Sequence, residues 1–350
     1  MAVPKTRRVA AIDGSGKFVL IEEPVPAPKP GQVLVENRAT LISPGTELGG
    51  VPAMRRQPRP DARPRRFGYS SAGVVVGVGE GCEDFPLGME VACMGGGYAL
   101  HSDYAAVPRN LTVPKPDGMS FETAAFAHLA ATAMHAVRRA DVVIAENFLV
   151  VGLGIVGQIA VQLGCVAGAH VAAMDFVQMR RDRAAKGGAK LVLEPGEAAV
   201  EAVRGFTRGY GLDCALIAFG GEATSAVEMI ARMMKVAPDG HRMGRLAIVG
   251  GANFQTKGWP VDVGNMDIRP SSRPGPGYHD EPWEHGADYP PVFVQWTTRR
   301  NMEDCLRFAQ DGQLDYEMLI THRLPLERFA EGAEALVSEP GKALAVILEP

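Results

Sequence analysis

The sequence lacks the features of a membrane, secreted or nucleic-acid-binding chain. Nowhere do about 18 apolar residues run together, so no membrane span is expected. The N-terminal stretch MAVPKTRRVAAIDGSG has no apolar core, so no signal peptide is expected and we predict a cytoplasmic protein. A formal net charge of −4 gives no general basic surface for nucleic acid or anionic lipid.

Cysteine is scarce and unpatterned. The five cysteines are Cys82, Cys93, Cys165, Cys214 and Cys305, an odd number at scattered positions. No C-x-x-C pair and no Cys/His cluster at zinc spacing is present, which fits reduced cytosolic thiols.

One segment is strongly basic, although the chain as a whole carries a small negative net charge. Six arginines lie within residues 55–66, in a segment broken by prolines. A solvated loop and a patch for an anionic ligand both remain open for this segment.

The chain changes character near residue 120. Before it, short apolar segments such as QVLVENRATLI and AGVVVGVG alternate with Gly and Pro, which predicts a compact β unit. Ser120 is a candidate N-cap for the helical stretch that follows. Strand and helix patterns then alternate, which predicts βαβ units and a parallel sheet. Residues 252–291 are irregular, and a loop of that length is often functional. The segment VFVQWT that follows predicts one more strand.

A glycine-rich turn between an apolar strand and an apolar helix is the strongest motif. In VVGLGIVG, Gly152, Gly154 and Gly157 form G-x-G-x-x-G. The first glycine permits a tight turn, the second lets the backbone approach a pyrophosphate, and the third lets helix and strand pack closely. The free N–H groups at the helix start, Ile155 and Val156, favour a negative charge. The motif predicts a dinucleotide site.

An acid at the end of the next strand favours NAD(H). Asp175 follows Gly152 at close to the expected spacing of roughly 20 residues. Its carboxylate can accept hydrogen bonds from ribose hydroxyls and would repel a 2′-phosphate. Arg180 and Arg181 follow, and they keep NADP(H) open. The predicted cofactor contacts besides the glycines are Ile155, Val156, Asp175, Arg180, Phe219 and Gly250.

The order of these parts resembles the medium-chain dehydrogenase/reductase superfamily, the relatives of zinc alcohol dehydrogenases. GYSSAGVVVGVGEGCEDFPLGMEVA is similar to that family's metal-ligand strand, and LITHRLPLERFAEGAEAL to its C-terminal signature. ISPGTE, RPGPGYHDEPWEHGADYP and VQWTTRRNM resemble a zinc-lacking, bi-domain-type branch. The resemblance implies an α/β fold with two domains. These are a GroES-like β-rich catalytic domain (1–128 and 299–350) and a Rossmann domain with a doubly wound parallel sheet (129–298), with a substrate-side loop at about 264–291.

The positions that hold zinc in the family carry other residues here. Zinc members place a Cys before Gly-Thr-Asp, then Gly-His-Glu, then a third ligand in the linking helix. This chain has Pro44, then Tyr69 and Ser70, then His128. Proline cannot ligate a metal, and tyrosine and serine are poor zinc ligands. The four-cysteine structural lobe is also absent, so we expect no zinc and a Tyr69 side chain that fills the metal pocket.

The same resemblance points to the residues of the reaction centre. Without a metal, the substrate oxygen must still exchange a proton, and its developing charge must be stabilised. We expect His128 to act as base, Tyr69 to donate to the oxyanion and Thr46 to relay protons, with an ionisation between about 5.5 and 8 in the pH profile. Thr132 matches a residue that packs on the nicotinamide. Each of these three residues has a structural alternative. His128 could be a core histidine, Tyr69 a phenol that fills space, and Thr46 a turn cap.

Substrate contacts are expected from the irregular loop. Its aromatic rings can stack on the CH faces of a sugar while its charged groups meet hydroxyls, and such polar contacts give specificity. His101 matches a family position in the substrate pocket, although it could instead lie at the surface. The predicted substrate contacts are His101, Arg273, Tyr278, His279 and Trp283.

The sequence is consistent with three functions. The leading one is a metal-independent, NAD(H)-dependent oxidoreductase that interconverts a secondary alcohol and a ketone on a sugar, cyclitol or nucleotide sugar. The alternatives are a zinc-free NAD(P)H double-bond reductase of the quinone or enoyl type, and a nucleotide-binding protein without turnover. The expected partner is a small molecule, with no nucleic acid or membrane, and the family resemblance implies a homodimer or homotetramer.

Overall fold

The chain folds into two compact units. The structure is a computed structural model that describes residues 3–256, 258 and 263–350. Unit 1 comprises residues 1–131, 274–312 and 316–350, and unit 2 comprises residues 132–273 and 313–315. Across the described ranges, every helix is too short or too polar to cross a membrane.

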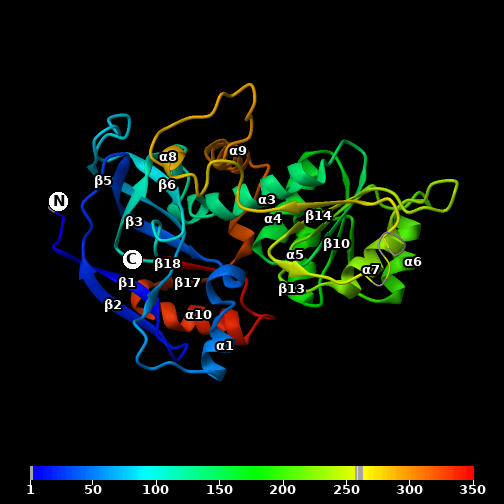
Figure 1. The fold of residues 1–350 in the computed structure, drawn as a ribbon, viewed down its shortest axis with the longest axis horizontal. Coiled ribbons are helices and arrows are strands. Elements are labelled where there is room, and N and C mark those ends of the chain that lie inside the picture. Colours follow the sequence, from blue (N-terminus) through cyan, green and yellow to red (C-terminus); the bar gives the residue numbers. More distant parts are fainter. Residues whose placement is uncertain (1–2, 257, 259–262) are drawn as a thin grey trace. The chain divides into compact units, whose positions relative to one another are not determined.

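Unit 1 is built on two largely antiparallel sheets, as the punctuated apolar segments predicted. One sheet has the order β17-β18-β3-β5-β6-β8 with β7 also paired to β3, and the other has the order β2-β1-β4. The blue, cyan and red strands of Figure 1 belong to these sheets. Their bounds are β1 (Thr6–Ile12), β2 (Phe18–Pro24), β3 (Gln32–Ile42), β4 (Arg65–Arg66), β5 (Ser70–Val78), β6 (Glu90–Met94), β7 (Tyr104–Pro108), β8 (Thr112–Pro114), β17 (Ile320–Pro325) and β18 (Ala345–Glu349).

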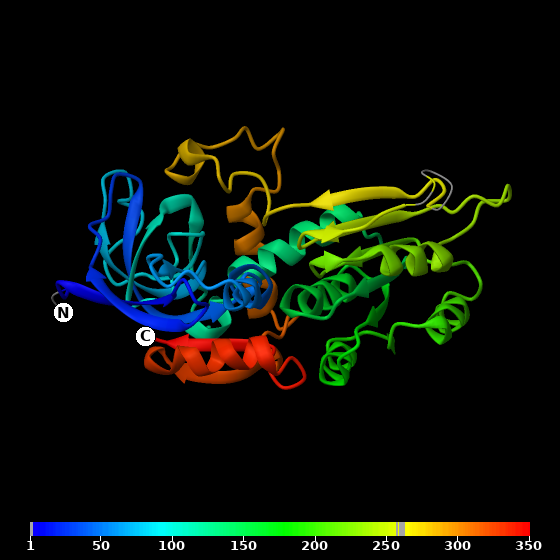
Figure 2. The same ribbon diagram turned by 60° about the horizontal axis from the view of Figure 1, so that its bottom comes forward.

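Helices connect the strands of unit 1, and one of them, α10, covers a core. Helix α10 packs on β17 and β18 through Phe329 and Ala333, and the ring of Phe329 lies 6.0 Å from that of Phe67. Figure 2 shows this red helix lying along the sheet strands. The helices of this unit are η1 (Pro44–Leu48), α1 (Val51–Arg56), η2 (Arg109–Leu111), α2 (Phe121–Ala124), α8 (Glu281–Glu284), α9 (Thr298–Gln310), η3 (Glu317–Leu319), η4 (Leu326–Arg328) and α10 (Phe329–Ser338).

The helical stretch after residue 120 begins as predicted but is divided. Ser120 Oγ accepts a hydrogen bond from the Thr123 N–H at 3.1 Å and caps α2. The chain then interrupts the helix for two residues before α3 (Ala127–Ala140), so one predicted helix is two.

Unit 2 contains a six-stranded parallel sheet, which confirms the predicted Rossmann architecture. The order is β11-β10-β9-β12-β14-β16, and the first strand of the motif, β9, lies near the centre. Figure 1 draws this sheet and its helices in green and yellow. Their bounds are β9 (Asn147–Val151), α4 (Ile155–Val166), β10 (His170–Met174), α5 (Gln178–Lys186), β11 (Leu191–Leu193), α6 (Glu197–Phe206), β12 (Cys214–Ile217), β13 (Gly221–Glu222), α7 (Thr224–Met233), β14 (Arg245–Val249), β15 (Ala252–Asn253) and β16 (Asp267–Ser271).

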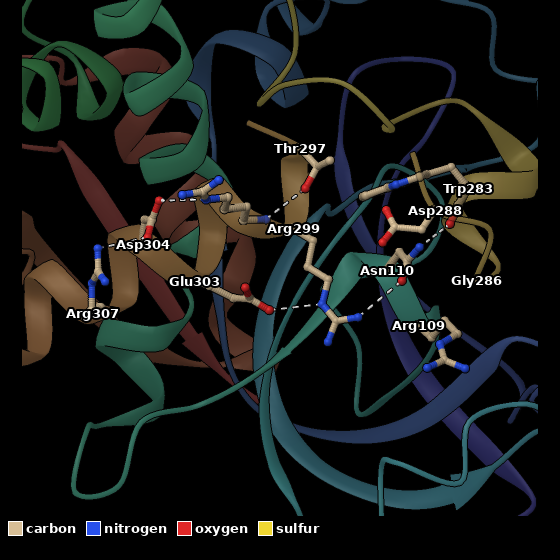
Figure 3. Close-up of a pocket in the computed structure, with 11 residues that line it drawn as sticks. Arg109, Asn110, Trp283, Gly286, Asp288, Thr297, Arg299, Glu303, Asp304 and Arg307 are labelled. Carbon is tan, nitrogen blue, oxygen red and sulfur yellow. Dashed lines mark hydrogen bonds and ion pairs between the residues drawn. The ribbon is translucent and has the colours of Figure 1, made fainter. Parts of the chain in front are cut away.

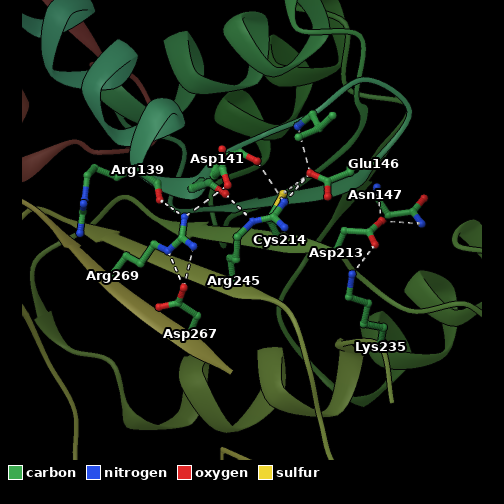
Figure 4. A network of polar contacts seen from close by, with 12 residues as sticks. Arg139, Asp141, Glu146, Asn147, Asp213, Cys214, Lys235, Arg245, Asp267 and Arg269 are labelled. Carbon is green, nitrogen blue, oxygen red and sulfur yellow. Dashed lines mark hydrogen bonds and ion pairs between the residues drawn. The ribbon is translucent and has the colours of Figure 1, made fainter. Parts of the chain in front are cut away.

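Charged groups bind the amino ends of these strands together (Figure 4). Arg245, at the start of β14, forms an ion pair of 2.5 Å with Glu146, and Asp213 accepts from the Asn147 N–H at 2.9 Å. These contacts join the starts of β9, β12 and β14, which are neighbours in the sheet. The amino edge of the sheet is therefore structural, and the carboxyl edge carries the glycine motif.

One predicted strand is wrong. VFVQWT, residues 292–297, forms a turn and an irregular segment, with Val292 77% and Phe293 84% exposed. The two preceding prolines disfavour a continuous strand, and Thr297 instead caps α9 by accepting from the Arg300 N–H. The last strand of the parallel sheet is the polar β16.

The segment between β16 and α9 packs within unit 1, although we placed it with the Rossmann domain from the sequence. Asn110 Nδ2 donates to the backbone oxygens of Trp283 at 2.6 Å and Ala287 at 3.0 Å. Asn301 Nδ2 donates to Pro274 O at 2.7 Å. These side-chain bonds join residues far apart in the sequence, which no local pattern shows.

Candidate functional site

The glycine motif of unit 2 forms a tight strand-to-helix turn. Gly152 follows β9 with φ +90°, and a Cβ on it would lie 2.9 Å from Phe219 Cδ1. A Cβ on Gly157 would lie 1.9 Å from Gly152 O, so helix α4 could not keep this approach with any other residue there. No atom of the described residues lies within 4 Å of a Cβ placed on Gly154, so the space beside the turn is open.

Asp175 holds this turn from the end of the neighbouring strand. Its Oδ2 accepts from the Leu153 N–H at 2.7 Å, and its Oδ1 accepts from the Val177 N–H at 2.8 Å. Each carboxylate oxygen has a second acceptor site, so ribose hydroxyls can still bind. Arg180 Nη1 lies 3.7 Å from Asp175 Oδ2, so this predicted contact residue already faces the carboxylate.

The predicted cofactor residues gather at one edge of the sheet. Gly152, Asp175, Phe219 and Gly250 come after the carboxyl ends of β9, β10, β12 and β14. Ile155 and Val156 open α4, whose N-terminus carries no side-chain cap and leaves its N–H groups toward this edge. Thr132 lies half-buried on α3, one turn after His128. These residues fit the adenosine and pyrophosphate of a dinucleotide.

In unit 1, His128 and Tyr69 lie side by side. Their ring centroids are 4.3 Å apart, and His128 Nδ1 is 2.9 Å from the Tyr69 backbone oxygen. Because a carbonyl oxygen only accepts, Nδ1 is the protonated nitrogen and Nε2 is the basic one. Burial lowers the pKa of His128 to about 4, which is below the range that its unperturbed value led us to expect. The imidazole is therefore neutral at neutral pH.

The Tyr69 hydroxyl is kept in its protonated form. Burial raises its pKa, and the nearby charge of Glu47 raises it further, while hydrogen bonds with Ser43 and Thr46 act in the opposite direction. A phenol with a raised pKa donates a hydrogen bond without titrating. Thr46 is exposed, so a hydroxyl in contact with both Tyr69 and solvent is present, as the relay prediction requires.

Glu47 is a buried acid that the sequence reasoning missed. It is 3% exposed, its Oε2 accepts from the Ser43 N–H at 2.6 Å, and His101 Nε2 lies 3.2 Å from its Oε1. His101 is fully buried and its Nδ1 lies 2.8 Å from Thr40 Oγ1. The structure therefore places His101 in a buried pair with Glu47. The available signal was an acid in LISPGTEL, a segment without any other charged residue.

Three of the six arginines within residues 55–66 form structural contacts. Arg65 Nη2 donates to Glu47 O at 3.2 Å, which ties the basic loop to η1. Arg55 and Arg66 form ion pairs with Glu334 at 2.6 Å and Glu23 at 3.1 Å. The solvated-loop interpretation accounts for these three side chains.

Two of the predicted substrate residues join the His128 cluster. The ring of Tyr278 lies 6.0 Å from that of His128, and the Tyr278 hydroxyl accepts from the Gly96 N–H at 2.7 Å. His279 stacks on Tyr278 with centroids 3.9 Å apart and is exposed. The cluster therefore combines neutral imidazole, phenol and an exposed imidazole within one unit.

The other two loop residues lie elsewhere. Trp283 is 2% exposed, stacks on Tyr289, and lines a cavity of about 610 Å³ together with Arg109 and Arg299 (Figure 3). None of its lining residues belongs to the His128 cluster. Arg273 belongs to unit 2, is exposed and has φ +66°.

Comparison with known proteins shows what the chain is similar to. No protein-family model matches the chain. It is 27% identical over 382 residues to a probable zinc-binding alcohol dehydrogenase of Mycobacterium tuberculosis, covering 98% of this chain and 88% of the relative. It is 28% identical over 331 residues to D-guloside 3-dehydrogenase of Escherichia coli, covering 88% and 85%.

Solved structures agree over the whole chain. An Escherichia coli oxidoreductase/dehydrogenase of unknown specificity, described as involved in membrane biogenesis, matches with TM-score 0.80 and 19% identity, covering 98% of this chain and 99% of that chain. Galactitol-1-phosphate dehydrogenase from Escherichia coli matches with TM-score 0.76 and 21% identity, covering 98% and 100%. The resemblance to the medium-chain dehydrogenase/reductase family is confirmed. The relatives support an oxidoreductase acting on a secondary alcohol.

The residues at this family's zinc positions do not fit zinc. Ser70 Oγ donates to Ala125 O at 2.6 Å, Tyr69 remains a protonated phenol, and Pro44 has no ligating atom. Within the described ranges, no three His, Cys, Asp or Glu side chains gather as metal ligands would. We therefore derive no step through a metal, although the M. tuberculosis relative is named as zinc-binding.

Proposed function

We propose that the protein is a metal-independent, NAD(H)-dependent oxidoreductase that interconverts a secondary alcohol and a ketone on a polyhydroxylated substrate. The observation that carries the proposal is the His128–Tyr69 pair at the family's metal positions. It combines a neutral imidazole with a phenol that stays protonated. A proton acceptor beside a hydrogen-bond donor is what an alkoxide needs when no Lewis acid is present.

Each side chain then has a task. A bound nicotinamide would supply the hydride acceptor at the site. His128 Nε2 accepts the hydroxyl proton, because Nδ1 is committed to the Tyr69 carbonyl. The Tyr69 hydroxyl donates to the substrate oxygen as negative charge develops on it. Thr46, exposed and in contact with Tyr69, orients that hydroxyl.

The substrate class rests on the loop and the relatives. Tyr278 and His279 offer stacked rings and polar atoms beside His128. Such a surface suits a sugar-like molecule, whose CH faces stack while its hydroxyls form hydrogen bonds. Two of the similar proteins are named for a D-guloside and for galactitol 1-phosphate, which supports a polyol or glycoside.

We expect the protein to reduce NAD in the presence of a polyol or glycoside. The test is absorbance near 340 nm with NAD and, separately, NADP, across free and phosphorylated polyols and glycosides, before and after chelator dialysis. Turnover that survives the chelator supports the proposal. Chelator-sensitive turnover with stoichiometric zinc would remove the metal-independent mechanism, and NADPH-only reduction of enones would favour the double-bond reductase.

Asp175→Ser should weaken NAD binding by about 1–3 kcal/mol, the cost of leaving hydrogen-bonding groups unpaired. The same change removes the charge that faces Arg180 at 3.7 Å, so affinity for NADP should rise relative to NAD. Titration calorimetry with both nucleotides measures the two effects.

The matched control for this change is Asp182→Ser. Asp182 is an exposed acid on α5 that accepts from Gln178 Nε2 at 2.6 Å, and its loss should leave both affinities unchanged. Tighter binding of NADP than of NAD by the unaltered protein would contradict the cofactor assignment.

A further inference from the structure

A second cavity lies within unit 1, apart from the His128 cluster (Figure 3). Its volume of about 610 Å³ is within the range of small-molecule pockets. Residues 109–110, the loop around residues 283–288 and the first turns of α9 supply its lining. The proposed reaction uses none of these residues, so the cavity needs an explanation of its own.

The charges around the cavity balance. Its lining has four arginines and three acids, and Asp84 beside Arg109 adds a fourth carboxylate. Each guanidinium has a carboxylate partner: the pairs are Arg109–Asp84 at 2.9 Å, Arg299–Glu303 at 3.0 Å, Arg307–Asp304 at 3.1 Å and Arg300–Asp304 at 3.9 Å. Because no excess of either sign remains, a neutral ligand is favoured over an anion.

Trp283 contributes a buried donor without an acceptor. Its side chain is 2% exposed, and among the described residues no acceptor lies within hydrogen-bonding distance of Nε1. A buried N–H that stays unpaired costs free energy. An acceptor oxygen supplied from the cavity would therefore stabilise the bound state.

The indole cannot turn away to find another acceptor. Its ring stacks on that of Tyr289, with centroids 6.1 Å apart and an interplanar angle of 14°. A Cβ on Gly277 would lie 2.4 Å from Trp283 Cδ2, so the backbone there packs directly against the indole. Asn110 Nδ2 holds the Trp283 backbone oxygen at 2.6 Å. The direction of the indole N–H is set by these contacts.

Asp288 supplies an acceptor in the same cavity. Its Oδ1 accepts from the Tyr289 N–H at 2.8 Å, and its carboxylate forms no ion pair with a described residue. A hydroxyl group both donates and accepts hydrogen bonds. Adjacent hydroxyls of one molecule can therefore donate to Asp288 and accept from Trp283, while N–H groups of Arg299 that face no carboxylate bond the other oxygens.

We propose that this cavity is a second binding site, for a neutral polyhydroxylated molecule such as a sugar or polyol. The segment that carries Trp283 also reaches the rings beside His128, because Glu284 accepts from the His279 N–H at 2.8 Å and His279 stacks on Tyr278. Occupancy of the cavity should hold this segment in place. The binding itself does not depend on the proposed function.

Hydrogen exchange and indole fluorescence test the site with D-glucose as the neutral probe. We expect glucose to slow amide exchange in residues 283–288 and to change the emission of Trp283, one of three tryptophans in the chain. Glucose 6-phosphate should bind no more tightly than glucose, since the charges of the lining balance. Protection of these amides by inorganic phosphate alone, without protection by glucose, would overturn the inference.

Two variants test the two proposed contacts. Trp283→Phe keeps an aromatic ring and removes the N–H, so the Kd for glucose should rise about 5-fold to 10-fold. Asp288→Ala removes an exposed charged acceptor, and the Kd should rise by about 10-fold or more. The matched control is Asp311→Ala, an exposed acid just after α9, which should bind glucose as the unaltered protein does.

Asp288→Ala decides the question if Trp283→Phe lowers the Tm, because its side chain is at the surface. Unchanged glucose protection of residues 283–288 in both variants would overturn the inference.

His128→Ala keeps this site distinct from the proposed reaction centre, and it should leave the glucose protection unchanged. If glucose protects residues 283–288 in a protein that oxidises no polyol or glycoside, the inference stands and the proposed function falls. If polyols are oxidised and glucose gives no protection there, the function stands and the inference falls.

Discussion

Replacing His128 by alanine is expected to lower kcat by about 10²–10⁴, the usual contribution of a positioned acid–base group. The reason is geometric: Nδ1 donates to the Tyr69 carbonyl at 2.9 Å, so Nε2 is left as the accepting nitrogen beside the phenol. The Kd for NAD should not change. Steady-state kinetics together with nucleotide titration separate the two quantities.

The lowered pKa of His128 predicts how kcat depends on pH. A general base acts only when deprotonated, and burial has lowered the pKa of His128 to about 4. Activity limited by His128 is therefore full above this pKa and falls as the pH drops through about 4. An acid limb at the ordinary histidine value near 6.5 would assign the ionisation to another group.

Three companion variants make the result interpretable. His128→Asn keeps an amide that can donate to the Tyr69 carbonyl, so it distinguishes lost chemistry from lost packing if alanine lowers the Tm. His135→Ala, a half-buried histidine further along α3, should leave kcat unchanged. Tyr69→Phe should cost about 10²–10³ in kcat, as for the loss of one oxyanion donor. If only Tyr69→Phe abolishes turnover, the two roles are exchanged.

The parts of this site that the sequence predicted are those with local periodicity. The G-x-G-x-x-G turn, the strand ending at Asp175 and the Ser120 cap each depend on neighbours in the chain, and the structure has them in place. VFVQWT failed as a strand because two prolines precede it, and its side chains Val292 and Phe293 are exposed rather than packed on a sheet.

The parts that could not be predicted are set by burial and long-range contacts. The pKa of His128 depends on how completely unit 1 desolvates it, and the Glu47–His101 pair joins residues from η1 and the loop before β7. Trp283 was expected at the substrate, but Asn110, distant in sequence, bonds its backbone and it lines the separate cavity of Figure 3. The residue types indicated the chemistry of the site, but only the fold showed which side chains lie next to one another.

Alanine at two glycines of the motif should have different effects on folding but the same effect on cofactor binding. In Gly157→Ala the new Cβ would lie 1.9 Å from Gly152 O, so helix α4 must move from the turn. Overpacking of this kind costs about 1–3 kcal/mol or more, and we expect both a lower Tm and weaker NAD binding. Differential scanning calorimetry and nucleotide titration measure the two effects.

Gly154→Ala tests cofactor binding at this turn separately from the packing of α4. Gly154 has φ −67°, and no described atom lies within 4 Å of the position that the alanine methyl group would take, so the Tm should be unchanged. A pyrophosphate that approaches the backbone at this point would meet the methyl group, and NAD binding should weaken by roughly 10-fold to 100-fold. Gly205→Ala, on the exposed face of α6 with equally open surroundings, is the control and should only stabilise its helix. If Gly154→Ala binds NAD as tightly as the unaltered protein, the dinucleotide does not lie over this turn, and the glycines serve the packing of α4 alone.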